Sequence, residues 1–132
     1  MTTLFAQIGQ LFLGILFLVA GVNGFFVIFG LEPFIATSPA AMALFQFEYL
    51  LITEKSLEVI CGILLLTRQF IPLVLAILSP IVANIFLLHL FIDHSLLLLA
   101  TLVVITHGYL LFYYRSHFMN LLVRKPKHPT TL

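Results

Sequence analysis

Long runs without a charged side chain dominate this sequence. Residues 1–31, 69–92 and 94–114 contain no Asp, Glu, Lys or Arg, and Asp93 alone separates the last two runs. A helix needs about 20 predominantly apolar residues to cross a bilayer. Only 8% of the chain is charged, against roughly 25% in soluble domains, and its mean hydropathy is +1.20. The sequence therefore predicts an integral membrane protein.

The length of the chain limits what else it can contain. Its 132 residues leave room for at most about four or five crossings and for no soluble domain beside them. The first apolar run has no Lys or Arg before it, unlike a secretory signal, so we expect a retained first helix. Cys61 is the single cysteine, which excludes an internal disulfide. We expect one membrane domain covering residues 1–132.

The apolar runs and the turn residues between them define four expected helices. In chain order they are 4–29, 39–67, 70–92 and 95–115. Ser38 suits the N-cap of the second helix, and Pro39 suits its first position. Asp93 and His94 alone connect the last two helices, which therefore form a tight antiparallel hairpin. The expected fold is all-α, an antiparallel bundle of four transmembrane helices.

In the second of these helices, three of the charged residues stand close together: Glu54, Lys55 and Glu58. If they lay outside the membrane, the rest of the span would be residues 59–67, about nine residues or about 13 Å of helix. That length cannot cross a hydrocarbon core about 30 Å thick. We therefore expect one unbroken helix over 39–67, with these charges in its membrane-embedded part.

Basic residues predict the orientation of the bundle. Arg68 lies in the connection between the second and third helices, and the tail after the fourth helix carries Arg115, Arg124, Lys125 and Lys127. The other two connections carry Glu32 and Asp93 but no Lys or Arg. The positive-inside rule then puts both termini in the cytoplasm. We expect the tail to contact anionic lipid, and not to bind nucleic acid.

The strongest candidates for function are the three neighbouring charged residues of the second helix, Glu54, Lys55 and Glu58. Each charge at the bilayer centre costs about 2.5 to 3.5 kcal/mol, so unpaired charges facing lipid are disfavoured. The i, i+3 and i, i+4 spacings put all three on one side of the helix. We expect an ion pair between Lys55 and Glu58, with Glu54 either hydrated in a cavity or neutralised. Glu58 and Glu54 are candidates for proton handling and Lys55 for ligand binding; a purely structural pair is the alternative.

Four further polar residues fall within the apolar runs and are candidates for ligand binding: Asn23, Asn84, His89 and His107. Each also has a simpler interpretation. Asn84 could make an interhelical hydrogen bond, and a buried neutral His107 could bond to a neighbouring helix. Asp93 lies four residues after His89 and could hold the His89 side chain in place. The two histidines fall at different depths, so we expect no metal or haem site.

Three segments of the chain resemble the DoxX family of small four-helix bacterial membrane proteins. They are GILFLVAGVNGFF, LEVICGILLLTRQFIPLVLAILSPIVANIFLLHLFID and YLLFYYRSHFMNLL. The resemblance implies a single helical bundle in the bacterial inner membrane and an association with redox chemistry. Some members of that family are described as subunits of thiosulfate to quinone oxidoreduction or of membrane oxidoreductase complexes.

These observations favour a quinone-interacting or accessory subunit of a membrane oxidoreductase system, with an outward-facing polar cavity. No flavin, iron–sulfur or haem motif is visible in the sequence, so we expect no cofactor in the chain itself except a bound quinone, and electrons from a partner subunit. One alternative is a non-catalytic module that assembles a complex or binds a lipophilic ligand. Another is a small proton-coupled transporter. Catalysis by the chain itself and homo-oligomerisation are left open.

Overall fold

The computed structural model describes residues 2–43, 46–125 and 127, and every regular element in this part of the chain is a helix. The α-helices are α1 (Thr2–Ile28), α2 (Pro39–Ala43), α3 (Glu48–Leu66), α4 (Ile71–Phe91) and α5 (Leu97–Tyr113). Three single turns of 3₁₀-helix are η1 (His94–Leu96), η2 (Arg115–His117) and η3 (Met119–Leu122). The predicted all-α class is confirmed for these residues.

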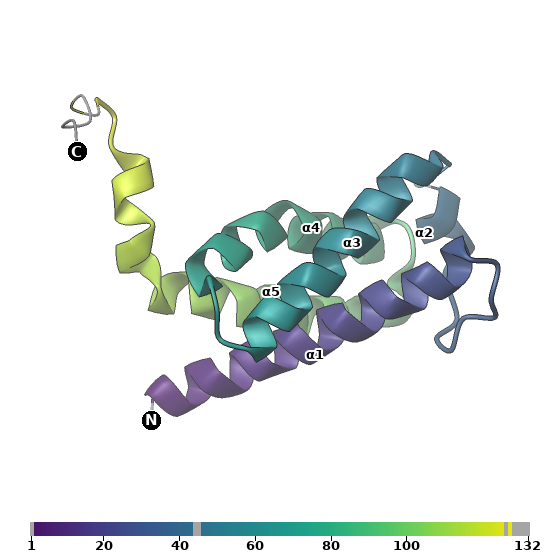
Figure 1. Ribbon diagram of the computed structural model, residues 1–132, viewed down its shortest axis with the longest axis horizontal. Helices are drawn as coiled ribbons and strands as arrows, with labels where there is room; N and C mark the ends of the chain where they lie inside the picture. Colours follow the sequence, from purple (N-terminus) through teal and green to yellow (C-terminus); the bar gives the residue numbers. More distant parts are fainter. Residues whose placement is uncertain (1, 44–45, 126, 128–132) are drawn as a thin grey trace.

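The four long helices form an antiparallel ring (Figure 1). Helix α1 packs most extensively against α3 and also against α5, while α4 packs against α3 and α5. The start of α1 meets the end of α5, where the Tyr109 hydroxyl donates to the Thr2 carbonyl at 3.1 Å. The start of α1 and the end of α5 therefore lie at the same end of the bundle, and α2 lies at the opposite end (Figure 1).

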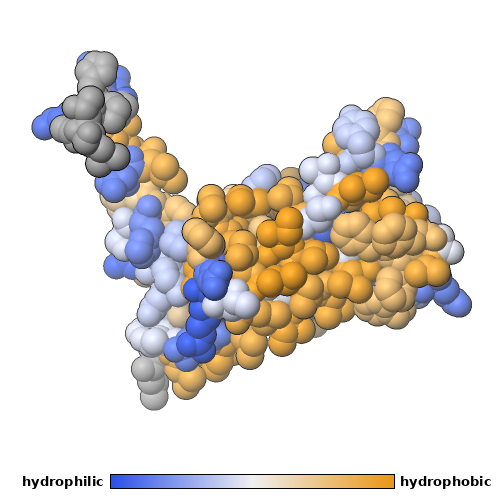
Figure 2. All heavy atoms as spheres, in the orientation of Figure 1, coloured by the Kyte–Doolittle hydropathy of each residue, from blue (hydrophilic) through white to orange (hydrophobic). Residues whose placement is uncertain are grey.

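Three helical segments are long and apolar enough to span a membrane: Thr2–Ile28, Ile71–Phe91 and His94–Tyr113. Apolar side chains cover the middle of the bundle on the face seen in Figure 2, and hydrophilic ones gather toward its ends. This is the surface expected of a membrane protein, whose lipid-facing side chains are apolar. Helix α3 has 19 residues, and four of them, Glu48, Glu54, Lys55 and Glu58, are charged.

The expectation of one unbroken helix over 39–67 is wrong. The structure has two helices there, and Phe47 before α3 is extended, with φ −100° and ψ 114°. The 19 residues of α3 extend about 28 Å at 1.5 Å each, close to the thickness of the hydrocarbon core. The N-cap prediction is confirmed, since the Ser38 hydroxyl accepts from the Ala41 N–H at 3.4 Å.

The remaining expected helices agree with α1, α4 and α5 to within a few residues. The turns η2 and η3 after α5 were not expected. Of the basic tail, positions 126 and 128–132 lie outside the described residues. Figure 1 shows the segment after α5 turning away from the bundle.

Glycines allow the backbones of α1 and α3 to touch. A Cβ atom added at Gly62 would lie 2.7 Å from the backbone nitrogen of Leu18 and 2.9 Å from the carbonyl oxygen of Gly14. A Cβ at Gly21 would lie 3.0 Å from the backbone nitrogen of Val59. Small residues allow such close approach between membrane helices. Gly14, Gly21 and Gly62 thus lie where the two helix backbones meet.

Candidate functional site

A cavity of about 470 Å³ extends from the middle of the bundle toward the end where α2 lies. Most of its wall is apolar, with side chains from α1, α4 and α5 such as Leu16, Ile85 and Val103. Five of the seven predicted site residues also line it: Glu54, Lys55, Glu58, Asn84 and His89. The cavity is therefore an apolar chamber whose polar groups come from α3 and α4.

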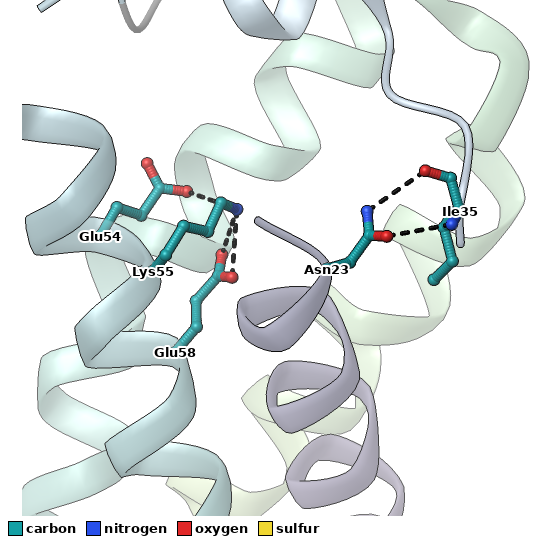
Figure 3. Close-up of polar contacts among 5 residues, drawn as sticks. All are labelled: Asn23, Ile35, Glu54, Lys55 and Glu58. Carbon is teal, nitrogen blue, oxygen red and sulfur yellow. Dashed lines mark hydrogen bonds and ion pairs between the residues drawn. The ribbon is translucent and has the colours of Figure 1, made fainter. Parts of the chain in front are cut away.

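On α3, Lys55 lies between two carboxylates (Figure 3). Its Nζ is 3.2 Å from Oε1 and 3.1 Å from Oε2 of Glu58, and 3.7 Å from Oε1 of Glu54. Glu58 is only 1% exposed. The predicted ion pair between Lys55 and Glu58 is confirmed, and it provides this buried carboxylate with two charge-assisted hydrogen bonds.

The position of Lys55 depends on Gly24 of α1. A Cβ atom at Gly24 would collide with the methylene groups of the Lys55 side chain. The glycine thus leaves room for the lysine stem to lie along α1 while its ammonium group turns back to Glu58. Gly24 therefore packs against a side chain of the charged group Glu54, Lys55 and Glu58.

On α4, His89 and Asn84 face the same cavity. Nδ1 of His89 lies 2.8 Å from the backbone carbonyl oxygen of Asp93. The interpretation that Asp93 holds His89 is confirmed, although the contact is made by the carbonyl and not by the carboxylate. For Asn84, the structure gives no side-chain hydrogen bond to another described residue, so its amide is available to the cavity.

The connection between α1 and α3 forms part of the cavity wall at the end of the bundle where α2 lies. Ile35 and Ala41 from this segment line it. Asn23 fixes the segment to α1, because its Nδ2 donates to the Ile35 carbonyl at 3.2 Å and its Oδ1 accepts from the Ile35 N–H at 3.0 Å (Figure 3). Hydrogen bonds from the Ser38 hydroxyl and from Ser95 hold the pKa of Asp93, between α4 and η1, at about 2. The segment therefore contacts both α1 and the turn after α4.

Asn23 and His107 do not line the large cavity. Asn23 borders a smaller cavity of about 120 Å³ beside Lys55. Both polar atoms of the Asn23 amide are hydrogen-bonded to the backbone of Ile35. Nε2 of the buried His107 lies 2.9 Å from the carbonyl oxygen of Leu75. This bond joins α5 to α4, as the simpler interpretation of His107 predicted. Binding by Asn23 or His107 stays a prediction.

Sequence reasoning missed two contributions to this region: Gln10, and the segment between α1 and α3 that lines the cavity. Gln10 is buried in α1, and its Nε2 donates to the Leu65 carbonyl of α3 at 2.7 Å. The sequence did contain a signal that Gln10 faces another helix, because Gln10 lies one turn before Gly14 on the same face of α1. For Ile35 and Ala41 we find no signal, because their place depends on how an irregular segment folds back.

This arrangement can hold an amphipathic molecule, with an apolar body against α1 and α5 and polar atoms toward α3 and α4. Among the described residues, no group of three or more His, Cys, Asp or Glu side chains could hold a metal ion. Comparison of the chain with protein-family models, curated proteins and solved structures gives no match. A functional proposal therefore has to be built on the cavity and its polar groups.

Proposed function

We propose that the chain is a four-span protein of the bacterial inner membrane with both termini in the cytoplasm. Helix α3 is the fourth span, because it is about 28 Å long and its central charges pair with one another beside the cavity. Arg68 and Arg115 follow α3 and α5 at the end where the chain starts, in agreement with the positive-inside rule. Reporters fused after residue 132 and within the segment after α1 should lie on opposite sides. A same-side result would contradict this topology.

We further propose that the cavity binds a quinone and that the protein is a quinone-interacting or accessory subunit of a membrane oxidoreductase. The observation that carries this proposal is the combination of a mostly apolar cavity of about 470 Å³ with a few polar side chains. Its volume is within the roughly 300–1,000 Å³ typical of small-molecule sites. A quinone combines an apolar ring and tail with two polar oxygen atoms, which suits such a site.

The polar residues then have separate roles. Asn84 and His89 on α4 both line the cavity, and the Asn84 amide can donate to an oxygen atom of the ring. Glu58 and Glu54 are the candidates for accepting or delivering protons, and Lys55 balances their charge. A bound quinone supplies the redox chemistry, and a partner subunit supplies or takes the electrons. The resemblance to the DoxX family supports this assignment.

Filling the cavity tests the proposal directly. Ala100 is a buried residue of α5 that lines the cavity, and Ala100→Phe should occupy part of its volume. Leu98 is on the same helix but 78% exposed, so Leu98→Phe is a matched control on the lipid-facing side. In nanodiscs, a short-chain ubiquinone analogue should bind to the unaltered protein and to Leu98→Phe, and at least tenfold more weakly to Ala100→Phe. Equal affinity in all three would contradict binding in this cavity.

A second candidate is a non-catalytic membrane module that binds a lipophilic ligand or assembles a complex. The observation that favours it is that Lys55 and Glu58 already satisfy each other. Mass spectrometry of molecules that copurify with the protein from native membranes separates the two candidates. A quinone together with an oxidoreductase subunit supports the first, whereas another lipid without a redox partner supports the second.

A further inference from the structure

The hydrogen-bonding state of His89 follows from its partner. A carbonyl oxygen can only accept, so the Nδ1 atom 2.8 Å from the Asp93 carbonyl must carry the hydrogen. In neutral histidine the other ring nitrogen is then an acceptor. His89 is buried and lines the cavity, and the ring nitrogen that does not contact Asp93 is therefore an acceptor and not a donor.

Glu58 already engages the Lys55 ammonium group through two hydrogen bonds. An ammonium group has three hydrogens and no lone pair. The Lys55 group faces both oxygens of Glu58, at 3.2 and 3.1 Å, and the nearer oxygen of Glu54, at 3.7 Å. Only the two Glu58 contacts are within hydrogen-bond distance, so a ligand carbonyl would have to compete with the Glu54 carboxylate for the third hydrogen.

The carboxylates, by contrast, retain capacity to accept. Each has about four lone-pair sites, and both oxygens of Glu58 face Nζ as acceptors do. Of the five polar residues that line the cavity, Asn84 offers the two hydrogens of its amide and Lys55 offers the one hydrogen that Glu58 does not engage. The polar part of the cavity is therefore rich in acceptors and poor in donors.

We propose that the cavity prefers a ligand that donates hydrogen bonds, an aromatic hydroxyl compound such as the reduced quinol, over the quinone, which can only accept. This inference rests on the proposed quinone-binding function and specifies which redox form the site selects. A buried acceptor left without a partner is costly, so sites lined by acceptors discriminate strongly against ligands that lack the hydroxyl. Selection of the reduced form would make the protein a quinol-binding site rather than a quinone-reducing one.

Three ligands of nearly the same shape test the inference on the unaltered protein in nanodiscs without oxygen. They are a short-chain ubiquinone analogue, its quinol, and the dimethyl ether of that quinol, which keeps the oxygens but has no hydroxyl hydrogens. The expected result is that the quinol binds at least tenfold more tightly than the other two. If the quinone binds as tightly as the quinol, or more tightly, the inference fails while the proposed quinone-binding function stands. If the ether matches the quinol, hydroxyl donation is not what the site selects, and the inference fails as well. If none binds, the proposed function itself fails.

His89→Phe tests the residue assignment. It removes the Nε2 acceptor but keeps an aromatic ring of similar size, so the ratio of quinol to quinone affinity should fall at least threefold. Leu98→Phe is again the control and should leave the ratio unchanged. An unchanged ratio in a folded His89→Phe protein would overturn the role of His89 as an acceptor.

Discussion

Replacing Gly62 with alanine should destabilise the protein by forcing α1 and α3 apart. The added Cβ would lie 2.7 Å from the backbone nitrogen of Leu18, 2.9 Å from the carbonyl oxygen of Gly14 and 3.0 Å from the Cα of Leu18. All three atoms belong to the backbone of α1 and cannot turn aside as a flexible side chain could. The two helices must therefore separate.

The size of the effect follows from these distances. Ordinary van der Waals contact begins near 3.4 Å, so α1 must retreat by roughly 0.7 Å, and a gap of that size forfeits a quarter to a half of the dispersion energy of each affected contact. Overpacking of this kind costs about 1–3 kcal/mol. Since α1 and α3 form the most extensive contact between elements, we expect a value in the upper part of that range.

Unfolding by sodium dodecyl sulfate in mixed micelles, followed by circular dichroism, measures the change. Gly108→Ala on α5 is the matched control, because a Cβ there meets nothing within 4 Å. Alanine is the better helix former by up to about 1 kcal/mol, so the control should be neutral or slightly stabilising. Equal stability of the Gly62→Ala and Gly108→Ala proteins would refute the close approach of the two helix backbones.

Three other substitutions test the polar contacts by the same unfolding measurement and by hydrogen exchange. Lys55→Met should cost about 3–5 kcal/mol because it leaves buried carboxylate charge unpaired; the double change Lys55→Met with Glu58→Met should recover part of this loss, and no recovery would contradict the ion pair. Asn23→Ala should speed amide exchange at Ile35 at least tenfold, because both hydrogen bonds between the two residues are lost. An unchanged exchange rate would contradict these hydrogen bonds. Gln10→Met should cost roughly 0.6–1.5 kcal/mol through loss of one interhelical hydrogen bond; a neutral result would mean that this bond adds nothing.

Local spacing was enough to predict the charged cluster. Glu54, Lys55 and Glu58 are three and four residues apart on one helix, so their mutual contact follows from helix geometry alone. The same reasoning paired His89 with Asp93. It could not tell that the carbonyl, not the carboxylate, makes the contact, because that depends on how the chain turns after α4.

Contacts between distant segments could not be predicted in this way. The paired hydrogen bonds between Asn23 and Ile35 require an irregular segment to fold back on α1. Gln10 donates to a carbonyl oxygen 55 residues away in the sequence. The break before α3 was missed because Pro39 and Ser38 give a strong start signal, and no Gly or Pro follows to stop the helix before Glu48.

The contact between Gly24 and the Lys55 stem has a consequence for biogenesis. In the proposed four-span arrangement, α3 leaves the insertion machinery after α1, and each of its central charges would cost about 2.5 to 3.5 kcal/mol if it entered lipid alone. The face of α1 around Gly24 is already made by then and receives the lysine stem. We therefore expect α1 and α3 to partition into the bilayer as one unit, so that the first half of the chain is the insertion unit and α3 on its own fails to integrate.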